Sequence, residues 1–103
     1  MSQRYREVLD YEMGARMIVE FTTDRRTVVD YAVILTVDDV DTEATVRVYD
    51  GAHGVNDLHR HNRRGEKAPA ASFHAGTLGE GMRAAIVAVR ADYNEMIEAW
   101  RAT

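Results

Sequence analysis

Three histidines lie close together in the middle of the chain, and they are the side chains best suited to chemistry. His59 and His61 are two positions apart, so both imidazoles project from one face of an extended segment. His53 precedes them across only five residues, so a loop can bring all three together. Two neighbouring histidines can divide general acid and general base work near neutral pH. This pattern points to metal-independent cleavage of RNA, in which one group activates the 2′-hydroxyl and another protonates the leaving oxygen.

Charged side chains that can assist such a reaction flank the histidine pair. Arg60 lies between the two histidines and Arg63 follows them. A guanidinium group beside a reacting phosphate stabilises the negative charge that develops on it. Asp50 and Asp57 can each orient an imidazole by accepting its second N–H group. The expected catalytic residues are the acid–base pair His59 and His61, supported by His53 and Asp50.

Two more side chains stand on the strand that leads into the histidine segment. Arg47 and Tyr49 alternate with valines, which places both on the outward face of the predicted strand. From that face, a tyrosine ring can stack on a base and an arginine can contact a phosphate. Ordinary surface placement is the alternative. The expected substrate-binding residues are Arg60, Arg63, Tyr49 and Arg47.

Two other uses of the histidine segment remain open. Three histidines and an aspartate could bind Zn²⁺ or another divalent ion, with an open position for catalysis. Their spacing, however, matches no established zinc signature. The segment can also be a polar hairpin whose histidines simply face water. The preferred hypothesis requires neither a bound metal nor a cofactor.

At the same place the sequence resembles a known family. Residues 49–54, YDGAHG, followed by HRH at residues 59–61, are similar to the YDNAHG…HRH signature of TumE-like toxins and of related small bacterial and archaeal proteins. Gly51 replaces the usual Asn, and four residues, 55–58, follow Gly54 where family members often have fewer. The resemblance implies the toxin of a toxin–antitoxin pair that acts on RNA, with a cognate antitoxin protein as partner. The matching positions are Asp50, His53, His59 and His61, with Arg60 between the last two.

The charge of the chain is unevenly distributed. Net charge is −4 at pH 7 and the pI is about 5.5, which argues against a general nucleic-acid coat protein. Residues 51–75, in contrast, hold three Arg, one Lys and two acids, a net +2, together with all four histidines. This basic island fits a local phosphate contact, although a solvated hairpin tip would have the same composition.

Composition excludes several classes of protein. Hydrophobic residues make up 46% and charged residues 29% of the 103 residues, which is typical of one globular domain. The absence of cysteine excludes disulfides, thiolate metal sites and thiol catalysis. No apolar run approaches the ~20 residues of a membrane span, and the N-terminus lacks a signal-peptide pattern. We therefore expect a cytoplasmic protein.

The elements that must position the histidines are strands followed by a helix. Apolar residues alternate along residues 16–22, 27–37 and 43–49, and the short polar connections favour antiparallel pairing. Residues 58–63 and 70–74 are weaker strand candidates. Near the N-terminus, Tyr5, Val8 and Leu9 indicate at most a short amphipathic helix.

The last quarter of the chain predicts one long helix. Thr77 and Glu80 have the spacing of a capping box, and an apolar stripe recurs every three or four residues across 78–101. The sequence thus predicts a single α+β domain over residues 1–103, with an antiparallel four- to five-stranded sheet packed against this helix. The alternative to an RNA-directed enzyme is a non-enzymatic interaction module, a homodimer that pairs through an edge strand or the helix.

Overall fold

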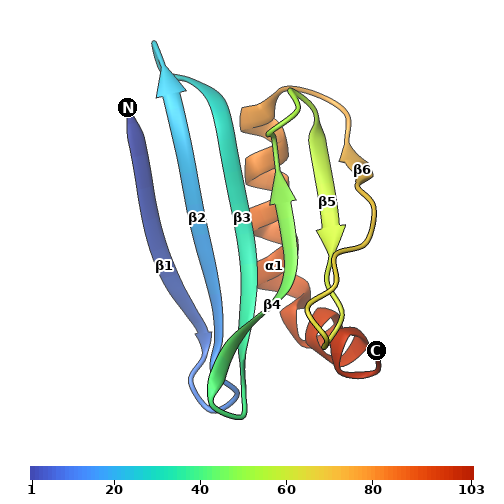
Figure 1. The fold of residues 1–103 in the computed structure, drawn as a ribbon. Helices are drawn as coiled ribbons and strands as arrows, with labels where there is room; N and C mark the ends of the chain where they lie inside the picture. Colours follow the sequence, from blue (N-terminus) through green and yellow to red (C-terminus); the bar gives the residue numbers. More distant parts are fainter.

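The structure, a computed structural model, describes all 103 residues as an antiparallel sheet with one long helix across one of its faces (Figure 1). The six strands follow one another in the sheet in the same order as in the chain. The predicted α+β fold is confirmed, but the sheet has six strands rather than four or five. The elements are β1 (Ser2–Asp10), β2 (Ala15–Asp24), β3 (Thr27–Asp39), β4 (Thr42–Asp50), β5 (Asn56–Arg60), β6 (Ala71–His74) and α1 (Leu78–Arg101).

The N-terminal segment is a strand and not the short helix that the sequence suggested. Residues of β1 pair with β2 from Ser2, opposite Thr22, to Asp10, opposite Ala15. Because β1 is an edge strand that α1 does not cover, most of its side chains are exposed and no apolar alternation is needed (Figure 1). Backbone pairing with β2 therefore determines the structure of this segment, and that pairing leaves no pattern in the side chains.

The core lies between α1 and the alternate residues of the central strands. Tyr31, Val33 and Leu35 of β3 point toward the helix and are at most 2% exposed. The sequence placed Val29 on the same face, but Val29 is 48% exposed. A register shift between β2 and β3 at this point leaves Val29 without a paired residue, and Val28 packs against the core in its place. The buried helix residues that complete the core are Met82, Ala85, Val89, Met96, Ile97 and Trp100.

The helix begins and ends at the predicted residues. Thr77 Oγ1 accepts a hydrogen bond from the Glu80 backbone N–H at 3.1 Å, and Glu80 Oε1 accepts one from the Thr77 backbone N–H at 3.0 Å. This capping box satisfies two N–H groups that the helix itself cannot pair. No helix of the structure is long and apolar enough to cross a bilayer.

One ion pair fastens the edge strand to the helix. The Arg90 guanidinium donates to both carboxylate oxygens of Glu7, at 2.9 and 2.7 Å. These hydrogen bonds hold the pKa of Glu7 below its ordinary value. Because the folded pKa is depressed, the pair contributes stability above pH 4.5, and that contribution is lost as pH falls through the folded-state pKa.

We expect Glu7→Gln to lower the free energy of unfolding by up to about 1 kcal/mol at pH 7, since the pair is partly exposed. The difference from the native protein should shrink as pH falls below 4.5 and the native carboxyl also becomes neutral. Urea denaturation at a series of pH values measures it. Glu20→Gln breaks the more exposed pair with Arg4 and is the control. If the difference in free energy of unfolding between Glu7→Gln and the native protein grew as pH fell, the ionised Glu7–Arg90 pair would not be its cause.

Candidate functional site

Asp50, Asp57 and His59 meet on the face of the sheet that α1 leaves open. In the antiparallel pairing of β4 with β5, Asp50 lies opposite Asp57 and Val48 lies opposite His59. The alternating neighbours, Tyr49 and Leu58, point the other way into the core. One oxygen or nitrogen atom from each member of the Asp50–Asp57–His59 cluster lies within 4.8 Å of the others. The strand register therefore brings two carboxylates and an imidazole together.

His59 is buried in this cluster, its side chain only 7% exposed. Its Nε2 atom lies 3.3 Å from Asp50 Oδ2, and its Nδ1 atom is buried with no hydrogen-bond partner. A general base must have a nitrogen within reach of the substrate. Because one nitrogen of His59 faces Asp50 and the other is enclosed, the structure does not offer His59 to a bound RNA.

The two carboxylates have no strong cationic partner. Asp57 is 13% exposed, and the nearest basic atom is Nδ1 of the exposed His53, at 3.7 Å. One oxygen of Asp50 accepts a hydrogen bond from the Ala52 N–H at 3.3 Å. Neither aspartate forms an ion pair with an arginine or lysine. Partly buried carboxylates side by side repel each other, so a cation between them would lower the cost of the arrangement.

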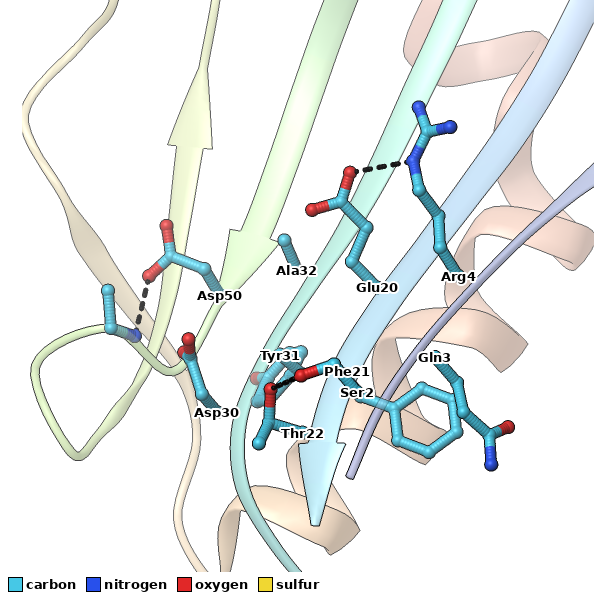
Figure 2. Close-up of a pocket in the computed structure, with 11 residues that line it drawn as sticks. Ser2, Gln3, Arg4, Glu20, Phe21, Thr22, Asp30, Tyr31, Ala32 and Asp50 are labelled. Carbon is cyan, nitrogen blue, oxygen red and sulfur yellow. Dashed lines mark hydrogen bonds and ion pairs between the residues drawn. The ribbon is translucent and has the colours of Figure 1, made fainter.

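A hollow of about 540 Å³ opens on the sheet face beside Asp50 (Figure 2). Arg4 and Glu20 form an ion pair at 3.0 Å within it, and Asp30 lies near Asp50 on its wall. The hollow is lined by residues of β1, β2, β3 and β4, so solvent reaches the edge of the Asp50–Asp57–His59 cluster from this side.

Cationic side chains gather elsewhere, beside the C-terminal end of α1. Arg47 of β4 lies directly opposite Arg60 of β5. Both line a cavity of about 130 Å³ with His61 and Trp100, and Arg60 and His61 also line a second cavity of about 370 Å³ with Lys67. We refer to Arg47, Arg60, His61 and Lys67 as the cationic cluster.

The cationic cluster, like Arg25, Arg26 and Arg83 elsewhere in the chain, lacks carboxylate partners. Like charges directly opposite on neighbouring strands are destabilising, yet Arg47, Arg60 and Lys67 form no ion pair. Arg47 Nε is buried without a hydrogen-bond partner, and Arg47 Nη1 reaches only the Tyr49 hydroxyl, at 3.4 Å. By contrast, seven arginines of the chain do pair with carboxylates: Arg4, Arg6, Arg16, Arg63, Arg64, Arg90 and Arg101.

His61 belongs to the cationic cluster and not to the surroundings of His59. Its backbone N–H donates to the Val46 carbonyl at 3.1 Å, and His61 forms an isolated bridge with Lys67. Burial, and next the charge of Lys67, lower the pKa of His61. None of the three main cavities is lined by both His59 and His61. The two histidines of the predicted acid–base pair therefore have different neighbours.

Tyr49 is placed differently from the prediction. Its side chain is 4% exposed and packs edge-on against Phe73, with ring centres 4.8 Å apart. The cause is a bulge: Leu35 pairs with Arg47 and Thr36 with Thr45, so Val46 is an extra residue in β4. After the bulge, the side chains of β4 that the sequence pattern placed on the outward face lie on the helix face instead. Both Arg47 and Tyr49 therefore turn toward the helix side. Tyr49 is thus part of the core and is not available to stack on a base.

Arg63 is also engaged within the protein. Its guanidinium pairs with Asp39 at 3.0 Å and lies 5.5 Å from the centre of the Trp100 ring. Of the four predicted substrate-binding residues, the structure brings Arg47 and Arg60 together and adds Lys67, which sequence reasoning missed. The bridge between His61 and Lys67 brings Lys67 to the site, and no local motif signals that contact.

Comparison with known proteins gives one match. A family model described as a domain of unknown function, DUF7718, matches residues 1–103. No curated protein and no solved structure matches the chain.

Proposed function

We propose that this chain, which belongs to the DUF7718 family of domains of unknown function, is a toxin-like protein that acts on RNA. The observation that carries the proposal is the cationic cluster. An acidic protein that pairs most of its arginines places Arg47 and Arg60 directly opposite each other, beside Lys67, with no carboxylate among their partners. A phosphate group supplies the missing negative charge and accepts hydrogen bonds from both guanidinium groups.

In the proposed cleavage of an RNA strand, the same cluster supplies one general base and two guanidinium groups for the phosphate. In the proposed reaction, His61 takes the proton of a 2′-hydroxyl as its oxygen attacks the neighbouring phosphorus. The bond from phosphorus to the 5′-oxygen breaks, and solvent water protonates the leaving oxygen. Arg47 and Arg60 stabilise the charge on the five-coordinate phosphorus. The products are a 2′,3′-cyclic phosphate and a 5′-hydroxyl, and no metal takes part. His59, held by Asp50, is not assigned a role in proton transfer.

RNA affinity tests the proposal directly. Arg60→Gln/Lys67→Gln should weaken binding of a fluorescent single-stranded RNA at least tenfold in an anisotropy titration. The titration is repeated at several salt concentrations, and the logarithm of the binding constant is plotted against the logarithm of the salt concentration. The slope for the double variant should be smaller in magnitude than the native slope by about 0.7 for each lost phosphate contact. Arg4→Gln/Arg83→Gln removes the same charge away from the cluster and should bind RNA as the native protein does. Equal weakening by both double variants would indicate that only net charge matters.

Cleavage and toxicity distinguish an enzyme from a binding protein. His61→Ala should retain RNA affinity and lose cleavage of the bound strand. Induced expression of the native protein in a bacterial host should arrest growth, whereas His61→Ala at matched protein level should not. As partners we propose RNA and a cognate antitoxin protein whose carboxylates occupy the cationic cluster.

The free edge of β1 favours a second candidate, a homodimeric interaction module without enzymatic activity. Of the eight exposed large hydrophobic residues, four lie in the first eleven residues of the chain, on or beside this edge: Met1, Tyr5, Val8 and Tyr11. An unpaired strand edge can pair with the edge of a second copy. No RNA affinity in the titrations above, together with a dimer in light scattering, would favour this candidate over the first.

A further inference from the structure

We propose that the Asp50–Asp57–His59 cluster binds a divalent metal ion of the Zn²⁺ or Mn²⁺ class. This site is separate from the cationic cluster and does not depend on the proposed action on RNA. It also differs from the metal site that the sequence left open, which used three histidines. In the structure the donors are two carboxylates and one imidazole, while His61 lies with the cationic cluster.

The spacing of the donor atoms fits one ion. His59 Nε2 and Asp50 Oδ2 are 3.3 Å apart, and all three donors lie within 4.8 Å of one another. Two ligands bound at about 2.0–2.1 Å to a tetrahedral ion lie about 3.4 Å from each other. A metal ion can therefore sit among the three donors with little movement of the strands, since the pairing of β4 with β5 already fixes Asp50 opposite Asp57.

The burial of His59 is an independent indication of a ligand. Its imidazole is more than nine-tenths buried and directs Nε2 at Asp50 Oδ2. The nitrogen without a hydrogen-bond partner, Nδ1, faces away from the cluster, so a cation at Nε2 would not supply its partner. A cation bound at Nε2 would use the one nitrogen that faces the carboxylates and would balance the charges of Asp50 and Asp57.

The surroundings provide a fourth donor and a route for entry. His53 Nδ1 is 3.7 Å from Asp57 Oδ2, and its side chain is 75% exposed, so the ring can turn toward the ion. The hollow is lined by Asp50 but not by Asp57 or His59, so from this side solvent reaches the cluster at Asp50 (Figure 2). Mixed imidazole and carboxylate donors favour Zn²⁺ or Mn²⁺ over Ca²⁺, which prefers oxygen donors alone.

Metal uptake by the purified protein tests the proposal. Equilibrium dialysis against Zn²⁺, followed by elemental measurement, should find one ion per chain, and Mn²⁺ should bind at the same site in electron paramagnetic resonance titrations. Asp57→Asn keeps the shape of the side chain and should weaken Zn²⁺ binding at least a hundredfold. His59→Gln should do the same. Asp39→Asn, at a carboxylate that pairs with Arg63, is the matched control and should bind Zn²⁺ as the native protein does.

Two further results separate this site from its alternatives. His61→Ala should leave Zn²⁺ affinity within about twofold of native, because His61 is not a ligand. Saturating Zn²⁺ should raise the melting temperature of the native protein and leave that of Asp57→Asn unchanged. The proposal is overturned if the native protein takes up no ion, or if Asp57→Asn, shown to be folded by circular dichroism, binds Zn²⁺ as tightly as the native chain. Loss of RNA binding alone would not affect it.

Discussion

Asn56→Ala is expected to lower the free energy of unfolding by about 3 kcal/mol, although it removes one small polar side chain. Asn56 is 1% exposed and joins three parts of the fold. Its Oδ1 accepts a hydrogen bond from the Tyr31 hydroxyl at 2.7 Å. Its Nδ2 donates to the carbonyl oxygens of His74, Gly76 and Thr77 at 3.2–3.3 Å. Alanine would leave the buried Tyr31 hydroxyl unpaired, at a cost of about 1–3 kcal/mol, and would remove three partly buried hydrogen bonds, although the Thr77 carbonyl would still accept from the Gly81 N–H.

Denaturant unfolding followed by circular dichroism measures this loss. Tyr31→Phe removes only the hydroxyl that donates to Asn56 and should cost about 1–1.5 kcal/mol. Asn62→Ala, at a half-buried asparagine whose side-chain hydrogen bonds all stay within the turn after β5, is the matched control for the residue type and should cost less than about 1 kcal/mol. If Asn56→Ala lowered the free energy of unfolding no more than Asn62→Ala, the hydrogen bonds of Asn56 would not hold these parts of the fold together.

Gly81→Ala is expected to destabilise the protein by about 3 kcal/mol, against the usual trend. A glycine inside a helix normally makes the helix about 1 kcal/mol less stable than an alanine at the same position. Here a methyl group on Gly81 would overlap the side-chain amide of Asn56, which lies directly against the helix backbone. Asn56 cannot move aside without losing its hydrogen bonds. The overlap therefore outweighs the gain in helix propensity.

Gly79→Ala, two residues earlier in the same helix, is the matched control for Gly81. An added Cβ there meets its nearest neighbour, Arg83 Nη1, at 3.6 Å, which is ordinary contact. We expect Gly79→Ala to be neutral or stabilising by up to about 1 kcal/mol. The double variant Asn56→Ala/Gly81→Ala should be less destabilised than the sum of the single variants, since the amide that meets the methyl is gone. Additive losses would show that the two side chains do not compete for the same space.

Residue pattern predicted the elements that have one buried face and one exposed face. Apolar residues recur every three or four positions in the helix from 78 to 101 and every second position in the strand through Val33 and Leu35. The first repeat fits only a helix with one buried face, and the second fits only a strand with one buried face. The edge strand β1 has no such period, because most of its side chains face solvent. The bulges at Val29 and Val46 were not predictable either. Each depends on how two strands align, and a single sequence does not contain that alignment.

Most side chains of the candidate site stood out in the sequence, Lys67 excepted, but their grouping did not. Histidines two positions apart suggested one joint site for His59 and His61. The register of β4 and β5 instead places His59 with Asp50 and Asp57, and the end of β5 at Arg60 leaves His61 beside Lys67. These groupings depend on contacts between strands and on where β5 stops. Spacing along the chain identifies side chains that can do chemistry, whereas pairing across strands decides which of them act together.

The bulge at Val46 makes the faces of this segment depend on strand pairing as well as on residue type. A chain of the same length that paired regularly in β4, without the bulge, would turn Arg47 and Tyr49 to the opposite side of the sheet. A relative that lacks one residue between Ala44 and Arg47 needs no bulge, and its arginine still lies opposite Leu35 on the helix side. A deletion at the bulge should therefore leave the cationic cluster in place, whereas loss of the bulge at unchanged length should disperse it.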